Sequence, residues 1–223
     1  MKVSVVQFPG TNCEYDTKYA FEKLGASIEI VWHQKSEIDA KSDLVVIAGG
    51  FSYGDYLRSG AIARFSPVMD AVAKHAARGG KVLGICNGFQ VLTESRLLPG
   101  ALKRNEGLHF ISKHHHLKVA SNSNDFMRKL SINDVVNIPI AHHDGNYYID
   151  EESKKSLYDN EQVLLHYCDE NGNISNPNGS VDAIAGVCNA QKNVFGLMPH
   201  PERAMESILG SQDGIKMLEG FFA

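Results

Sequence analysis

The chain has 223 residues and a formal net charge of −4, with 43% hydrophobic and 22% charged residues. This composition is ordinary for a globular protein and lacks the basic footprint of a nucleic-acid binder, so we expect no nucleic-acid partner. No apolar stretch reaches the roughly 18 residues that a bilayer span requires, and the apolar start of the chain is too short for a signal peptide. These features predict a cytoplasmic protein with no membrane partner.

The first hundred residues alternate between short apolar strands and helices. We expect strands over residues 3–8, 28–32, 43–48 and 82–85, and helices over residues 15–24, 67–78 and 88–95. The run at 43–48 is continuously apolar, as in a strand that is buried on both faces. This alternation predicts a parallel sheet covered by helices on both faces.

The pattern changes after Pro99 and Gly100. Short strand candidates separated by turn-rich sequence follow, at residues 108–111, 117–120, 135–139, 147–149, 163–167, 183–188 and 194–197, and then a final helix over about residues 212–222. The sequence shows no repeat and no long linker. We therefore expect a single domain over residues 1–223, with an α/β fold in three layers. Its mostly parallel open sheet would have a flavodoxin-like core with added antiparallel strands.

Cys86 lies in the run Gly84-Ile-Cys86-Asn-Gly88, between an apolar strand and a helix. A nucleophile at such a sharp turn points out of the backbone, and the start of the next helix offers free N–H groups and favours a thiolate. Cys168 and Cys188 lie in apolar runs typical of buried structural cysteines, whereas the role of Cys13, in a turn after a strand, stays open. Cys86 is therefore the candidate nucleophile.

His200 is the best candidate for the base among the ten histidines. It directly follows a predicted strand in the run Pro199-His200-Pro201-Glu202, where the Glu202 carboxylate can turn back to the imidazole and stabilise its charged form. Sites in open parallel sheets form at the carboxyl ends of strands, so Cys86 and His200 should meet. The sequence thus predicts a catalytic set of Cys86, His200 and Glu202.

Acyl transfer also needs hydrogen-bond donors for the developing oxyanion. Gly49 and Gly50 follow the strand at 43–48, and the N–H of Asn87 directly follows the nucleophile. The two glycines alone would fit a tight turn equally well. Beside the cysteine turn, we expect them to form the oxyanion site together with Asn87.

Two histidine clusters could suggest a metal site: His114 to His116, and His142 with His143 beside Asp144. Adjacent strand residues point to opposite faces, so three consecutive histidines cannot converge on one ion without a loop. We interpret the first cluster as a solvated turn after Lys113, and we expect no metal.

The run from Gly84 to Gln90, together with Pro199-His200-Pro201-Glu202, resembles the class I glutamine amidotransferase family, in which Cys, His and Glu hydrolyse glutamine. The runs Gly49-Gly-Phe-Ser-Tyr-Gly-Asp55 and Asn176-Pro-Asn-Gly-Ser180 are similar to those of one branch, the glutaminase subunits of phosphoribosylformylglycinamidine synthase. The resemblance covers about residues 3–220. One departure is Ala141-His-His-Asp-Gly145, where the family often reads Ala-His-Gly-Glu-Gly.

The resemblance implies a mechanism. Cys86 would attack the side-chain amide of glutamine and form a glutamyl thioester, with His200 moving the protons, and water would then release glutamate. The resemblance also implies that Gln90 helps to bind glutamine. It places Asn105 and the segment near Phe110 where related enzymes hold the α-amino and carboxylate groups.

The resemblance further implies that ammonia passes to a partner that uses ATP to make formylglycinamidine ribonucleotide in de novo purine biosynthesis. The partners would be a large synthetase subunit and a small bridging subunit. No Gly-x-x-x-x-Gly-Lys-Ser/Thr run is present, so we expect no cofactor on this chain, with ATP and Mg on the synthetase.

Two alternatives remain at this point. Another cysteine hydrolase of the same superfamily would share the cysteine turn, but Glu202 and Gln90 argue against it. A non-catalytic regulatory subunit would have no need of an intact Cys86, His200 and Glu202.

Overall fold

The computed structural model describes residues 1–222, and its centre is one large sheet. The strands of this sheet are β1 (Lys2–Gln7), β2 (Ser27–Trp32), β3 (Leu44–Ile47), β4 (Lys81–Ile85), β6 (Ile111–Val119), β7 (Val135–His142), β9 (Val163–Cys168), β10 (Ile184–Cys188) and β11 (Val194–Leu197). Within the described residues they form nine strands in the order β2-β1-β3-β4-β11-β10-β9-β6-β7. Two short strands, β5 (Ala101–Lys103) and β8 (Asn146–Tyr148), pair separately.

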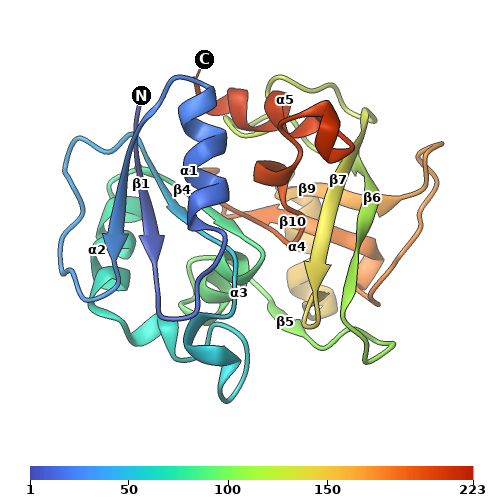
Figure 1. Ribbon diagram of the computed structural model, residues 1–223. Helices are drawn as coiled ribbons and strands as arrows, with labels where there is room; N and C mark the ends of the chain where they lie inside the picture. Colours follow the sequence, from blue (N-terminus) through green and yellow to red (C-terminus); the bar gives the residue numbers. More distant parts are fainter. Residues whose placement is uncertain (223) are drawn as a thin grey trace.

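Helices cover both faces of the sheet (Figure 1). They are α1 (Glu14–Lys23), α2 (Pro67–Ala77), α3 (Asn87–Glu94), α4 (Glu151–Asp159) and α5 (Asp213–Glu219). In the view of Figure 1, α1 and α5 lie in front of the sheet, and α2, α3 and α4 lie behind it. The predicted three-layer α/β fold is confirmed.

The sheet has a parallel half and an antiparallel half. Strands β2, β1, β3, β4 and β11 pair in parallel, which reproduces the flavodoxin-like order. Strands β10, β9, β6 and β7 pair antiparallel. Strand β11 joins the halves because it runs parallel to β4 and antiparallel to β10. The expected antiparallel strands therefore extend the edge of the parallel core.

Burial along the strands follows from these layers. All four residues of β3 are buried, as expected for a strand between two layers of helices. Burial along β7 alternates residue by residue, so one of its faces packs on the core and the other is more open. No helix in the described part of the chain combines the length and apolarity needed to cross a membrane.

Two local expectations were wrong. The strand expected at 108–111 begins only at Ile111 and then continues unbroken to Val119, so His114 to His116 belong to β6 and not to a solvated turn. Residues 111–118 of β6 pair with β7, and residues from His116 onward also pair with β9, so the β6 backbone is hydrogen-bonded along this stretch. The alternation argument still holds, since His115 is buried and His114 is exposed.

Helix α4 and the ribbon strand β5 were not expected from the sequence. Helix α4 buries only Leu157, so it lacks the apolar stripe that would have indicated a helix. Its start is stabilised by Asp150, whose side chain accepts a hydrogen bond from the Ser153 N–H at 2.9 Å.

Candidate active site

Cys86 occupies the turn between β4 and α3 with φ 51° and ψ −105°, a backbone conformation that a residue with a side chain rarely adopts. Two backbone hydrogen bonds hold it there. The Cys86 N–H donates to the Leu197 carbonyl at the end of β11 (2.8 Å), and the Cys86 carbonyl accepts from the Gln90 N–H in α3 (3.2 Å). Cys86, the candidate nucleophile, is thus fixed between the strand that precedes His200 and the helix α3 that follows Cys86.

The two glycines that flank Cys86 make this turn possible. A Cβ atom on Gly88 would lie 1.9 Å from the Ile47 carbonyl oxygen, and one on Gly84 would lie 2.7 Å from the Gly88 backbone. Only glycine therefore lets α3 begin so close to β3 and β4. The Gly-x-Cys-x-Gly spacing reports this close approach.

His200 and Glu202 form a buried pair just beyond β11. The His200 N–H donates to the Pro139 carbonyl of β7 (2.8 Å), and the single 3₁₀ turn η4 (Pro201–Arg203) brings Glu202 back to the ring. The His200 Nδ1 atom lies 2.7 Å from the Glu202 Oε1 atom. This contact leaves the opposite ring edge for chemistry, and the buried Nε2 atom there has no hydrogen-bond partner among residues 1–222.

The surroundings of His200 favour its charged form. The pKa of His200 is lowered by burial but is held well above its usual value overall. The Glu202 carboxylate raises it most, followed by the sulfur atoms of Cys86 and Cys13. An imidazolium held beside Cys86 stabilises a thiolate there and carries the proton that a leaving amine needs.

The glycines expected at the oxyanion site lie beside this pair. A Cβ on Gly49 would be 3.1 Å from His200 Cε1 and 3.4 Å from the Ile85 carbonyl, next to the nucleophile. Gly50 has φ +139° and packs so closely on Thr11 that a Cβ would lie 2.8 Å from the Thr11 Cα. The Asn87 side chain accepts a hydrogen bond from the Ser52 N–H (3.0 Å), which ties this segment to α3.

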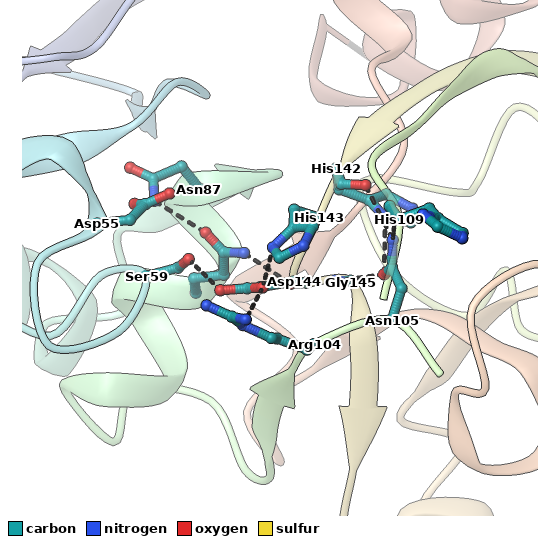
Figure 2. A network of polar contacts seen from close by, with 11 residues as sticks. Asp55, Ser59, Asn87, Arg104, Asn105, His109, His142, His143, Asp144 and Gly145 are labelled. Carbon is teal, nitrogen blue, oxygen red and sulfur yellow. Dashed lines mark hydrogen bonds and ion pairs between the residues drawn. The ribbon is translucent and has the colours of Figure 1, made fainter. Parts of the chain in front are cut away.

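A turn at residues 141–145 closes over Cys86. The Cys86 thiol points to the Ala141 carbonyl at 3.6 Å, and Gln90 Nε2 donates to the Asp144 carbonyl at 2.7 Å. The Asp144 carboxylate also accepts from Ser59 Oγ at 2.8 Å, so it links the turn to the loop over residues 51–59 (Figure 2). Cys86 is only 6% exposed as a result.

The residues expected to hold glutamine differ in their exposure and in their hydrogen bonds. Gln90 and Phe110 border the turn and the loop, and the half-exposed Phe110 ring lies 6.5 Å from the Phe51 ring. Asn105 is buried, and its amide nitrogen donates to the carbonyls of His109 and His142 at 2.9 Å each. Its oxygen accepts from Gly145 N–H at 3.0 Å and contacts His142 Nδ1 at 3.1 Å (Figure 2). In this structure Asn105 therefore fastens the 141–145 turn.

Sequence reasoning missed Cys13, Ser59 and Asp144 as parts of this site, because each reaches it only through the packing of separate loops. Ligand atoms of Cys13, His200 and Glu202 lie within 4.8 Å of one another, which suits a metal in number of ligands. However, Glu202 occupies the Nδ1 edge of His200, so an ion on the unpartnered Nε2 edge would face away from that carboxylate. The set fits a proton-transfer pair better than a metal site.

A strained cysteine beside a buried His–Glu pair, at the carboxyl ends of parallel strands, is the arrangement of hydrolases that form a thioester with their substrate. The family model of the CobB/CobQ-like glutamine amidotransferase domain matches residues 1–214. The chain is 73% identical to the phosphoribosylformylglycinamidine synthase subunit PurQ of Sulfurimonas denitrificans, over 99% of both chains. It is 56% identical to that of Campylobacter jejuni, over 99% of this chain and 96% of the relative.

A solved structure of PurLQS from Thermotoga maritima matches with a TM-score of 0.89 and 40% identity, covering 99% of this chain and 97% of the other. The chain therefore belongs to the glutamine amidotransferase family and, within it, to the PurQ subunits of phosphoribosylformylglycinamidine synthase.

Proposed function

We propose that this chain is the glutaminase subunit of phosphoribosylformylglycinamidine synthase. It hydrolyses glutamine and supplies ammonia to a cytoplasmic synthetase that makes formylglycinamidine ribonucleotide in de novo purine biosynthesis. The observation that carries this proposal is the strained Cys86 next to a buried His200–Glu202 pair, in a chain 73% identical to a PurQ subunit. The whole chain would act as a single glutamine amidotransferase domain.

In the first half of the reaction, the Cys86 thiolate attacks the carbon of the glutamine side-chain amide and forms a C–S bond. The N–H groups of Gly50 and Asn87 stabilise the oxyanion that develops, because they are fixed before the charge forms. The C–N bond then breaks, and His200 Nε2 gives its proton to the departing ammonia. A glutamyl thioester and a neutral His200 remain.

In the second half, the neutral His200 takes a proton from the water molecule that attacks the thioester. The C–S bond breaks and glutamate leaves, which restores the thiolate and the imidazolium. Glu202 keeps the ring oriented throughout. Gln90, Asn105 and Phe110 bind glutamine, and Asn105 does so by exchanging some of its bonds to the 141–145 turn.

The nucleophile is covered in this structure, which supports control by the partner. Glutamine reaches Cys86 only if the 141–145 turn or the 51–59 loop moves, and the Ser59–Asp144 hydrogen bond opposes that movement. The large synthetase subunit and the small bridging subunit are the partners that would shift this equilibrium. No cofactor is needed on this chain, and ATP and Mg would bind to the synthetase.

Glutamate release from glutamine tests the proposal. The chain is assayed alone and with its synthetase subunits, as wild type, Cys86→Ala and the matched control Cys188→Ala, which removes a buried thiol from β10. We expect low turnover alone and high turnover in the complex, with a loss of at least about 10³-fold for Cys86→Ala only. No turnover in any combination would refute the function. Turnover that persists in Cys86→Ala would refute the mechanism, and full activity without partners would refute the control.

A further inference from the structure

Cys13 is a second buried thiol at this site, and the mechanism does not use it. It lies just before α1 and is 2% exposed. Its N–H donates to the Gly49 carbonyl at 3.2 Å, and its own carbonyl accepts from Thr17 N–H at 2.9 Å. These bonds fix the thiol between the start of α1 and the segment that holds the oxyanion donors.

Cys13 takes part in a contact between α1 and the turn that carries Glu202. Arg203 Nη2 donates to the Cys13 sulfur at 3.1 Å, and Arg203 Nε donates to Asp16 Oδ2 at 3.0 Å. We call Cys13, Asp16 and Arg203 the arginine clamp. Arg203 directly follows Glu202, so its guanidinium lies near the carboxylate of that residue. The arginine clamp fixes the position of this positive charge.

The same sulfur also lies beside the ring of His200. A Cβ atom built on Gly49 would be 3.1 Å from Cys13 Sγ and 3.1 Å from His200 Cε1, so the thiol and the ring edge border the same small space. The titratable and charged groups around His200 are Glu202 and Arg203 from η4, Cys86 from the β4–α3 turn, Cys13 from the start of α1, and His142 from β7.

The thiol is suited to a neutral role. Burial raises the pKa of Cys13, so its sulfur stays protonated near neutral pH. The S–H donates to Asn12 Oδ1 at 3.2 Å while the sulfur accepts from Arg203. Cys13 thus satisfies a guanidinium N–H without adding a second negative charge beside Glu202.

An acceptor that could compete for Arg203 lies near this contact, since a carboxylate oxygen of Glu202 is within 4.8 Å of the Cys13 sulfur. Glu202 Oε2 is buried and has no hydrogen-bond partner in residues 1–222. If the Cys13 sulfur were absent, the freed guanidinium N–H would need another acceptor, and this oxygen offers a charge-assisted bond. A bond from Arg203 to Glu202 would partly neutralise the carboxylate beside the His200 ring. It would also turn the carboxylate and so change the orientation of the ring.

We infer that Cys13 is a positioning residue for the His200–Glu202 pair: its sulfur keeps the Arg203 guanidinium off the Glu202 carboxylate and supports the edge of the His200 ring. The effect on catalysis rests on the proposed glutaminase function. The effect on His200 itself does not, because it is a property of the folded chain.

Two measurements on Cys13→Ala, Cys13→Ser and the control Cys188→Ala test this role. In the complex with the synthetase subunits, we expect Cys13→Ala to lower kcat for glutamine hydrolysis about tenfold, with KM within about twofold of wild type. The serine variant retains an acceptor for Arg203 and should recover most of kcat. In the isolated chain, an NMR titration of the His200 ring, assigned with His200→Gln, should show its pKa lowered in Cys13→Ala and nearly unchanged in Cys13→Ser.

A double variant distinguishes the clamp from simple packing. In Arg203→Gln the competing charge is gone, so adding Cys13→Ala should cost much less than it does in the wild-type background. Equal losses in both backgrounds, or a wild-type kcat and His200 titration in Cys13→Ala, would overturn the inference. If the wild-type complex released no glutamate, the proposed function would fail while the titration would still decide the role of Cys13.

Discussion

The His200 Nδ1 atom lies 2.7 Å from Glu202 Oε1, and neither side chain exposes more than 1% of its surface. The two residues are separated only by Pro201, so a single helical turn sets the geometry of the pair. An acid held this close to a buried imidazole both selects the ring tautomer and stabilises the charged ring. Replacing the carboxylate by an amide of the same shape weakens both effects.

Glu202→Gln should retain the fold and lose most of the activity. The amide can still contact Nδ1, but it removes the negative charge and permits the wrong tautomer, so kcat should fall by roughly 10²- to 10⁴-fold. Steady-state glutamate release from the complex measures this, with Glu206→Gln as a control because Glu206 pairs with the Lys23 side chain away from His200. A loss below about threefold would show that Glu202 is only structural.

Gly88→Ala should destabilise the protein because its Cβ would lie 1.9 Å from the Ile47 carbonyl oxygen, a backbone atom that cannot rotate away. We expect a loss of about 3 kcal/mol in the free energy of unfolding. Urea unfolding measures it, with Gly107→Ala as the control, since a Cβ there meets nothing closer than His109 at 4.0 Å. Equal stability of the two variants would mean that α3 can shift away from β3.

His142 should make stability depend on acid pH. Burial and the nearby His200 charge lower the pKa of His142 from 6.5 to about 4. Between these values the unfolded chain binds more protons than the folded one. His142 therefore contributes on the order of 3 kcal/mol to the free energy of unfolding above about pH 6.5. This contribution is lost as the pH falls to about 4.

The measurement is the difference in unfolding free energy between wild type and His142→Gln at each pH. A difference is needed because burial raises the pKa of Asp55 to about 6, which stabilises the fold as the pH falls through the same range. The difference should shrink steadily from pH 7 to pH 4. Parallel curves for wild type and His142→Gln would contradict the shift.

Leu57 should matter for the partner and not for the isolated fold. It is 89% exposed in the loop that borders the 141–145 turn, and its φ of 69° suits aspartate, so Leu57→Asp introduces little strain. We expect the synthetase concentration for half-maximal glutaminase activity to rise about tenfold, as for loss of one good apolar contact. Ile132→Asp, at the other end of β7, is the control. Identical titrations for both variants would place the partner elsewhere.

The geometry of the candidate catalytic set of Cys86, His200 and Glu202 could be predicted because local patterns encode it. The two glycines of Gly84-x-Cys86-x-Gly88 indicate that α3 closely approaches β3 and β4 around Cys86. Pro201 between His200 and Glu202 indicates the turn that pairs them. The parallel sheet of the first strands followed from the alternation of strands and helices, and the continuous apolar run at 43–48 indicated cover on both faces.

The rest depended on contacts between distant segments. Ser59 and Asp144 are 85 positions apart, and nothing near either one indicates their hydrogen bond. The role of Asn105 was hidden for the same reason, since three of its four side-chain contacts are to His142 and Gly145, which lie 37 and 40 positions further along the chain. The histidines of β6 were assigned to a turn because their polarity outweighed the pairing that β7 and β9 supply.

Strand β11 lies between β4 and β10, although it is the last strand of the sheet in the chain. Its Leu197 carbonyl holds the Cys86 N–H, and its end delivers His200. During synthesis, the segment with the nucleophile therefore leaves the ribosome well before its base and before the strand that completes its strained turn. A partly made chain has a gap in the middle of its sheet and a thiol with no proton acceptor. Insertion of one late strand would thus close the sheet and bring His200 to Cys86 in the same step.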